Sequence, residues 1–294
     1  MKLAAALAAS ALAAVLTPAL AQQPAFHADA RLVIVHATVK NARGELVTSL
    51  DQHAFTVYEN GKRQPIALFR RDDVPVSLGL LIDNSGSMRT LRSRVEAAAL
   101  ALAHASNPDD EIFVVNFNDT VKLDVPFTSD WNVLAHGIAR VDAIGGTAMR
   151  DAIETAQTYL TEHGTRDRKV IVVITDGIDN ASTATRERIE REAEARDTVI
   201  FAIGLFGHAD RVSEGRHELD RLAERTGGLA FYPESVDDIE SIALNIARQI
   251  RSQYTIGYTP LNQKLDGSYR TIRVEVASPE RLAVHARSGY RAVP

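Results

Sequence analysis

The protein has 294 residues, of which 45% are hydrophobic and 24% are charged, and its formal net charge is −5. These are ordinary globular values, so they exclude a disordered chain, a collagen-like repeat and a multi-pass membrane protein. The modest negative charge without a basic stripe argues against a nucleic-acid partner, and the lack of cysteine excludes disulfides, thiolate metal sites and cysteine nucleophiles.

The first segment, residues 1–21, has the features of a cleaved signal peptide. Lys2 supplies a positive charge, an apolar run extends from Leu3 to Leu16, and Ala19-Leu20-Ala21 is the small-x-small pattern that signal peptidases cut. The run is short for a membrane anchor, which needs roughly 20 apolar residues. No later segment of the sequence is long and apolar enough to span a bilayer. We therefore expect cleavage near Ala21 and a periplasmic or secreted protein.

Residues 22–75 are expected to form the N-terminal part of a small β-sandwich. Apolar and polar residues alternate from Val33 to Lys40, as in a strand with one buried face. The pair Asn60-Gly61 separates the strand-like segment Phe55–Tyr58 from a second one, Pro65–Phe69, and this arrangement predicts a hairpin.

Strands alternate with helices between residues 76 and 253. The nearly continuous apolar run from Val76 to Ile82 is typical of a strand that is buried on both faces. Similar runs follow at Ile112–Phe117, Val170–Ile174 and Val199–Ile203. Amphipathic helical segments lie between these runs. Repeated βα units predict an α/β fold with a doubly wound, mostly parallel sheet.

Residues 254–294 return to a β pattern and are expected to form the C-terminal part of the sandwich. Each flank alone is near the minimum size for a stable sheet, and each would leave an edge exposed. We therefore expect the two chain ends to form one sandwich into which the α/β domain of residues 76–253 is inserted.

Five polar side chains fall on loops that should meet at one edge of the α/β sheet, because ligand sites in open α/β sheets lie at the carboxyl ends of the strands. They are Asp83, Ser85 and Ser87 after the first buried strand, Thr147 after Gly145-Gly146, and Asp176 after the strand at residues 170–174. All five are oxygen donors, which suit a hard cation such as Mg²⁺, with Ca²⁺ or Mn²⁺ as alternatives. Two carboxylates balance the charge of a dication, and a coordination position left to water can accept an external carboxylate.

The order D-x-S-x-S, Gly-Gly-Thr and T-D-G resembles the metal-ion-dependent adhesion site of von Willebrand factor type A domains, and the resemblance extends over roughly Val76–Gln253. It implies that the two serines and the threonine bind a metal, that the aspartates bind it directly or through water, and that a protein ligand supplies a Glu or Asp carboxylate. The stretches Ala54–Lys62, Tyr254–Tyr258 and Arg287–Tyr290 also resemble exported bacterial proteins in which such a domain lies between β segments. This second resemblance implies architecture more than activity.

We therefore expect an exported, non-enzymatic binding module that holds an acidic group of a protein ligand through a divalent metal, in adhesion or in an envelope protein–protein interaction. The glycine-rich nucleotide motifs and the G-x-S-x-G of serine hydrolases are missing from the sequence. A phosphotransferase or hydrolase that uses the same Asp and Mg²⁺ crevice is the best enzymatic alternative. A structural envelope protein with a vestigial site is the third hypothesis.

Simpler structural roles compete with metal binding at some of these positions. Ser85 and Ser87 alone would be read as caps of the next helix, but the presence of Thr147 and Asp176 favours a metal site. Asp179-Asn180 is interpreted as a solvated turn at the same rim. The charged segment Arg186–Glu192 is expected to be an exposed helix face with i, i+4 pairs.

Overall fold

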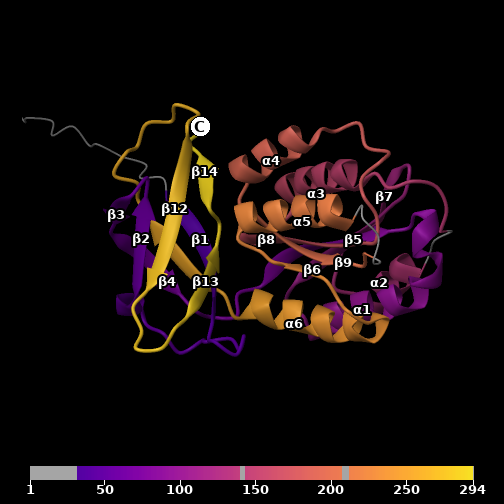
Figure 1. Ribbon diagram of the computed structural model, residues 1–294, viewed down its shortest axis with the longest axis horizontal. Coiled ribbons are helices and arrows are strands. Elements are labelled where there is room, and N and C mark those ends of the chain that lie inside the picture. Colours follow the sequence, from indigo (N-terminus) through magenta and orange to yellow (C-terminus); the bar gives the residue numbers. More distant parts are fainter. Residues whose placement is uncertain (1–31, 140–142, 207–211, 294) are drawn as a thin grey trace, which may run out of the picture. The chain divides into compact units, whose positions relative to one another are not determined.

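A six-stranded sheet forms the centre of the α/β part in the computed structural model, which describes residues 32–139, 143–206 and 212–293 (Figure 1). The strand order is β10-β9-β8-β5-β6-β7, and all neighbours are parallel except β6 and β7. The strands are β5 Val76–Asp83, β6 Glu111–Phe117, β7 Val121–Thr128, β8 Arg168–Thr175, β9 Thr198–Gly204 and β10 Ala230–Phe231. The sequence analysis missed β7, because its half-buried side chains interrupt any apolar run. The predicted signal peptide, residues 1–21, lies outside the described residues.

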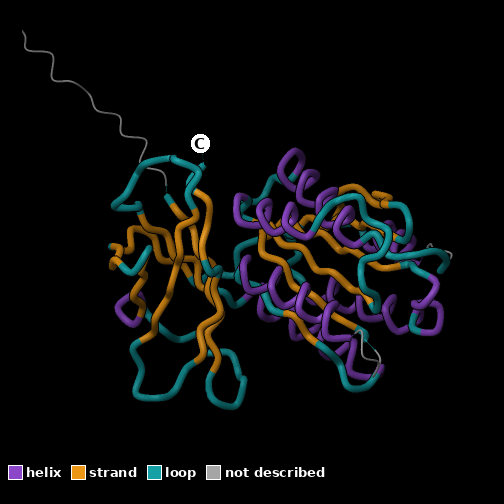
Figure 2. The backbone as a smooth tube through the Cα atoms, turned by 45° about the horizontal axis from the view of Figure 1, so that its top comes forward, coloured by secondary structure: helices purple, strands orange, loops and turns teal. Residues whose placement is uncertain are grey.

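Helices cover both faces of this sheet (Figures 1 and 2). One hydrophobic core packs under α1 Arg92–Ala105, α2 Trp131–Ala139 and α6 Ile239–Arg251. The core on the opposite face packs under α3 Met149–His163, α4 Arg186–Ala195 and α5 Val212–Thr226. Because β5 lies between β6 and β8 with helices on either side, all eight of its residues are buried. Among the described residues, no helix combines the length and apolar character needed to cross a membrane.

Two four-stranded antiparallel sheets combine strands from both ends of the described chain, in the orders β13-β1-β11-β4 and β14-β12-β2-β3. The strands are β1 Val33–Lys40, β2 Phe55–Glu59, β3 Lys62–Gln64, β4 Ile66–Arg70, β11 Tyr254–Tyr258, β12 Tyr269–Val276, β13 Ala283–Ala286 and β14 Gly289–Arg291. A third hydrophobic core contains residues from both sheets. The predicted fold class, a doubly wound α/β sheet with a small sandwich made from the chain ends, is confirmed.

The hairpin at Asn60-Gly61 forms, but its second strand differs from the prediction. Both turn residues have positive φ, 47° for Asn60 and 76° for Gly61, as this tight turn requires. The partner of β2 is β3, whereas Ile66–Arg70 crosses to the other sheet and pairs with β11. Pro65 lies between the two segments and has no N–H to donate to a ladder, so the chain can change sheets there.

The charged segment that begins α4 is only partly exposed, so that interpretation was wrong in part. The expected i, i+4 pair between Arg188 and Glu192 is present at 3.2 Å. Glu190, however, is buried and pairs with Arg221 of α5 at 2.8 Å. The α4 face therefore packs through ion pairs instead of facing water.

A buried polar network joins the two chain ends inside the sandwich. Glu59 of β2 accepts hydrogen bonds at 2.9 Å from the hydroxyls of both Tyr258 and Tyr290. The guanidinium of Arg270, which is only 1% exposed, lies 3.3 Å from the same carboxylate. Arg270 also donates to the backbone carbonyls of Asn262 and Lys264. A single buried carboxylate therefore organises three side chains from the C-terminal strands.

We expect Glu59→Gln to lower the free energy of unfolding by about 2–4 kcal/mol, because Arg270 would stay buried without a counter-charge. Urea denaturation followed by circular dichroism measures the effect. Glu280→Gln, which removes an exposed carboxylate, is the matched control and should have little effect. Equal midpoints for the two variants would contradict the assigned role of the network.

His36 links the sandwich to the α/β part electrostatically. Its pKa is well below the usual value because of its burial, with further contributions from the positive charges of Arg168 and Arg287. The ring nitrogen Nδ1 lies 3.2 Å from the hydroxyl of Thr255. The folded protein therefore holds this side chain in its neutral form.

The free energy of unfolding should fall as the pH falls below about 6.5, because the unfolded chain then binds a proton that the folded chain does not. The loss attributable to His36 is at most about 1.4 kcal/mol per pH unit. In His36→Gln, the contribution of His36 to the pH dependence of the free energy of unfolding should disappear. Denaturation midpoints between pH 7 and pH 5 test it, and parallel curves for the two proteins would refute it.

Candidate metal centre

Asp83 is the deepest residue of the candidate site. It is the last residue of β5 and is 0% exposed. Its Oδ1 atom accepts a 2.8 Å hydrogen bond from the backbone N–H of Ser85, and its Oδ2 atom accepts a 2.6 Å bond from the hydroxyl of Thr175 at the end of β8. Because β5 and β8 are parallel neighbours, their ends meet at one edge of the sheet. Hydrogen-bond donors at the ends of both strands therefore fix the orientation of the Asp83 carboxylate.

Ser85, Ser87 and Asp176 continue from Asp83 toward solvent. Ser85 is 2% exposed, whereas Ser87 is exposed and Asp176 is half-buried. The hydroxyls of the two serines are 3.1 Å apart, and Ser87 donates a 2.7 Å hydrogen bond to Asp176. Ser85 occupies the N-cap position of the short helix Gly86–Thr90, but its side chain makes no capping hydrogen bond. The Ser85 hydroxyl therefore does not serve as a helix cap.

Thr147 approaches from the third loop and is 2% exposed. A Cβ atom added to Gly177, the residue after Asp176, would lie 2.8 Å from the Thr147 hydroxyl oxygen. The loop that carries Thr147 is also bonded to the first loop, because Gly86 donates to the carbonyl of Gly145 at 3.1 Å. The structure therefore brings all three predicted loops together and places all five predicted residues in them.

The local electrostatics favour a cation at this position. Burial raises the pKa of Asp83 to about 6, hydrogen bonds from Thr175 and Ser85 oppose the shift, and the charge of Asp176 adds to it. Burial also raises the pKa of Asp176, and the hydrogen bond from Ser87 opposes that shift. Among the described residues, no Lys, Arg or His forms an ion pair with either carboxylate.

The donor chemistry fits a hard divalent cation. Two carboxylates and three hydroxyls are oxygen ligands of the kind that Mg²⁺, Ca²⁺ and Mn²⁺ accept. No group of three or more His, Cys, Asp or Glu side chains with metal-binding geometry occurs in the described part of the chain. A site here must therefore rely on the serine and threonine hydroxyls as well as on the two aspartates.

Several supporting residues escaped the sequence analysis. Asn84 donates a 2.7 Å hydrogen bond to the side chain of Asn116, and its carbonyl accepts from the N–H of Ile144 at 3.1 Å. Asp119 accepts from the N–H of Gly146 at 2.6 Å. A Cβ at Gly145, where φ is +80°, would lie 2.1 Å from Asp119, so glycine is required there. In the sequence, only the pair Gly145-Gly146 indicated such a close contact.

The interpretation of Asp179-Asn180 as a solvated turn was wrong in part, because Asn180 is exposed but Asp179 is not. The side chain of Asp179 is 1% exposed and accepts a 2.7 Å hydrogen bond from the N–H of Arg150. Asn180 accepts from the N–H of Thr147 at 2.9 Å, and its own N–H donates to the carbonyl of Thr147 at 3.0 Å. Both residues therefore hold the Thr147 loop in place.

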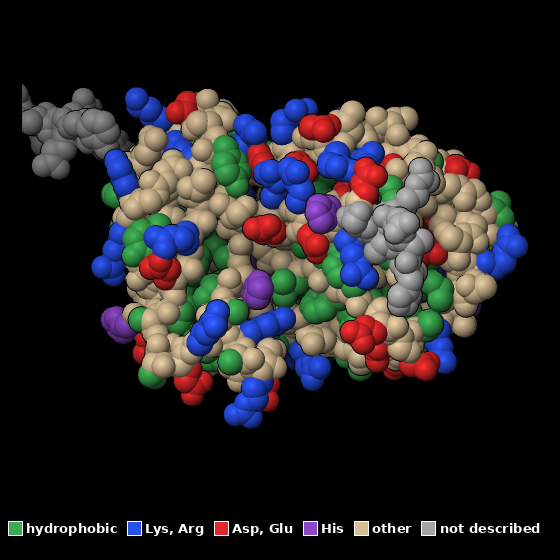
Figure 3. All heavy atoms as spheres, viewed as in Figure 1, with side chains coloured by type: hydrophobic (Ala, Val, Ile, Leu, Met, Phe, Trp, Pro, Cys, Tyr) green, Lys and Arg blue, Asp and Glu red, His purple; other side chains and the backbone are tan. Residues whose placement is uncertain are grey.

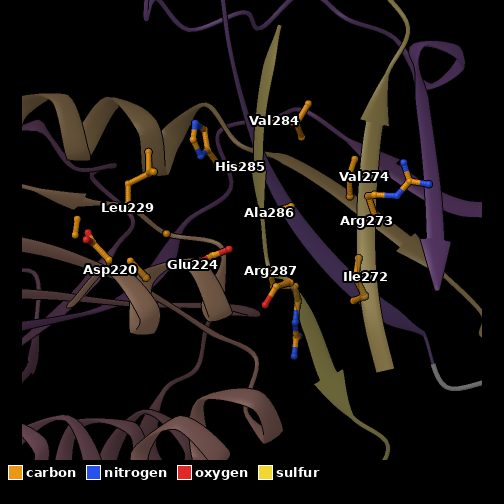
Figure 4. A pocket seen from close by; sticks show the side chains of 14 residues that line it. Asp220, Glu224, Leu229, Ile272, Arg273, Val274, Val284, His285, Ala286 and Arg287 are labelled. Atoms are coloured by element: carbon orange, nitrogen blue, oxygen red, sulfur yellow. The ribbon is translucent and has the colours of Figure 1, made fainter. Parts of the chain in front are cut away.

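A separate cavity of about 420 Å³ lies between α5 and the C-terminal strands (Figure 4). Its lining includes two acids, Asp220 and Glu224 of α5, and three basic residues, Arg273, His285 and Arg287, of which Arg273 points away from α5. The five predicted metal ligands are not among its lining residues. Acidic and basic side chains are also interspersed on the face shown in Figure 3.

Comparison with known proteins agrees with this architecture. Residues 78–178 match the family model of the von Willebrand factor type A domain. The structure superposes on a von Willebrand factor type A protein from Catenulispora acidiphila with a TM-score of 0.52 and 13% identity, over 91% of this chain and 75% of that one. No curated protein matches the sequence significantly.

A second similar structure is proximal thread matrix protein 1 from the mussel byssus, described with a zinc-occupied MIDAS motif. Its TM-score is 0.53 at 19% identity, over 65% of this chain and 49% of that one, so the present chain spans about half the length of the mussel protein. Similarity at this level of identity shows a shared fold. The family match identifies residues 78–178 as similar to a von Willebrand factor type A domain.

Proposed function

We propose that this protein is an exported, non-enzymatic binding module that captures an acidic side chain of a protein ligand through a divalent metal, with Mg²⁺ as the expected ion. Domains of this family are often metal-dependent protein-binding modules. The observation that carries the proposal is the convergence of a buried carboxylate, a half-buried carboxylate and three hydroxyls without a described cationic partner. Asp83, Ser85, Ser87, Thr147 and Asp176 would hold the metal.

The proposed role of each side chain follows from its burial and its hydrogen bonds. A bound dication would attract a carboxylate oxygen of the ligand. Asp83 supplies a fixed charge at the base, because Thr175 and the Ser85 N–H hold both of its oxygens. Ser87 is exposed at the solvent side of the group, so a ligand would approach there. Thr147 adds a neutral donor from a loop that Asn180 positions.

The enzymatic alternative is less favoured by the surroundings of Asp83. A nucleophilic aspartate must present an oxygen to a substrate, but both oxygens of Asp83 accept hydrogen bonds and the residue has no exposed surface. Turnover of a phosphate ester by the purified protein would nevertheless favour that alternative. Export to the periplasm or medium remains part of the proposal and rests on the sequence of residues 1–21.

Replacement of Asp83 by Asn should abolish most Mg²⁺ binding, with a dissociation constant raised at least about tenfold, or about 1.4 kcal/mol. The Asn oxygen can accept from the Ser85 N–H, and the Thr175 hydroxyl can rotate to accept from the Asn NH2 group, so the fold should persist, whereas Asp83→Ala would leave buried donors unpaired. Isothermal titration calorimetry with Mg²⁺, Ca²⁺ and Mn²⁺ gives the affinity and the preferred ion. Asp109→Asn, at an exposed turn, is the matched control. Identical titrations for the Asp83 variant and the wild type would exclude the metal site.

Thr147→Val should weaken Mg²⁺ binding less than Asp83→Asn does, because it removes a neutral donor and retains the shape of the side chain. Its larger effect should fall on ligand capture. Pull-down from envelope extract, with and without chelator, compares the variant with the wild type. Thr155→Val, on the exposed surface of α3, is the control. Chelator-resistant capture by the wild type would contradict a metal-bridged ligand.

A further inference from the structure

A second charged region lies at the opposite end of the sheet from the candidate metal centre. A cavity of about 430 Å³ is lined by the segment 164–169, which leads into β8, and by Val74 just before β5. The metal centre is at the other ends of the same two strands, at Asp83 and Asp176. Side chains from β1, β4 and β11 complete the cavity wall. The two sites are therefore structurally separate.

Positive charge is concentrated in this cavity although the whole chain has a net charge of −5. Its lining cations are Arg70, Arg166, Arg168 and Lys169, and its lining acids are Asp167 and Asp197. Asp197 already pairs with Arg287 at 3.0 Å. Within the described ranges, none of the four cations forms an ion pair. Asp110, Asp73 and Asp197 attract Arg168 only from beyond ion-pair distance, so no described carboxylate contacts these cations directly.

Arg168 is both buried and incompletely bonded. It is 3% exposed, and its Nη2 atom donates to the carbonyl of Ile250 at 2.9 Å and to the side chain of Gln253 at 2.6 Å. Its Nε and Nη1 atoms, like Nε of Arg166, have no hydrogen-bond acceptor among the described residues. Buried guanidinium N–H groups normally have acceptors, so this arrangement calls for an explanation.

This cavity and the cavity next to α5 are similar in size but differ in their charge. The cavity next to α5 is lined by two acids and three basic residues, whereas this one has four cations and only one acid outside an ion pair, Asp167. Ile34, Leu68 and Val74 provide apolar wall beside the charged groups. A mixed lining of this kind and a volume of this order are typical of small-molecule sites.

We propose that this cavity binds a small oxyanion that carries two or more negative charges, as a compound with carboxylate or phosphate groups does. The guanidinium groups of Arg70 and Arg166 can form paired hydrogen bonds with such groups, and the ammonium group of Lys169 adds a flexible donor. Arg168 contributes a buried positive charge behind them. Its pKa is lowered to about 10 by burial, so it remains protonated at neutral pH.

Calorimetric titration of the metal-free full chain with inorganic phosphate and with succinate, at constant ionic strength, tests the proposal. Arg70→Gln/Arg166→Gln should weaken binding of the preferred anion at least about tenfold. Both positions are suited to substitution, since Arg70 is exposed and Arg166 is half-buried. A preference for phosphate or for succinate identifies the chemistry of the anion, and either result supports the site.

The matched control is Arg43→Gln/Arg63→Gln, which removes the same charge from exposed positions elsewhere and should retain wild-type binding. Asp83→Asn should also bind the anion as the wild type does, which separates this site from the metal centre. Equal loss in both arginine double variants would show nonspecific charge attraction and overturn the proposal. The absence of binding of either anion at millimolar concentrations would overturn it as well.

Discussion

The pairing of strands from the two chain ends is the constraint on which the rest of the structure depends. β1 lies between β11 and β13 in one sheet, and β2 pairs with β12 in the other. Among the described strands, each end forms only one ladder of its own, β2 with β3 and β12 with β14, so neither end builds a sheet without the other. The α/β segment is therefore held at both of its ends, and the ion pair between Asp73 and Arg251, at 2.6 Å, closes the base of the insertion. Inside the sandwich, Glu59 of β2 accepts hydrogen bonds from Tyr258 and Tyr290 and so links the C-terminal strands to β2.

The junction between the sandwich and the α/β part bears on how a signal could pass between them. Helix α6 ends at Arg251 and β11 begins at Tyr254, with Gln253 buried between them. Gln253 accepts a hydrogen bond from Arg168 and donates one at 3.1 Å to Thr38 of β1. A shift of α6 would have to break or move these buried bonds. The contacts favour a rigid junction over a free hinge.

The two candidate sites place buried charges of opposite sign at opposite ends of the same strands. Asp83 lies at the carboxyl end of β5, and Arg168 lies at the amino end of its neighbour β8. Burial of an unpaired charge is costly, so each position raises the expectation of a ligand with complementary charge. Burial accordingly raises the pKa of Asp83 and lowers the pKa of Arg168, because it disfavours the charged form of each side chain.

The sequence by itself determined the fold class and the five candidate ligands, because long apolar runs, helical periodicity and three short motifs are local patterns. It could not determine β7 or the partner of β2, since half-buried edge strands resemble loops and strand pairing is a long-range choice. It also did not indicate the supporting roles of Asn84, Asp119 and Asn180, because their partners lie on other loops. The charged cavity around Arg168 has no sequence motif at all. Its lining residues come from distant segments, and only the packing of the sandwich against the base of the sheet brings them together.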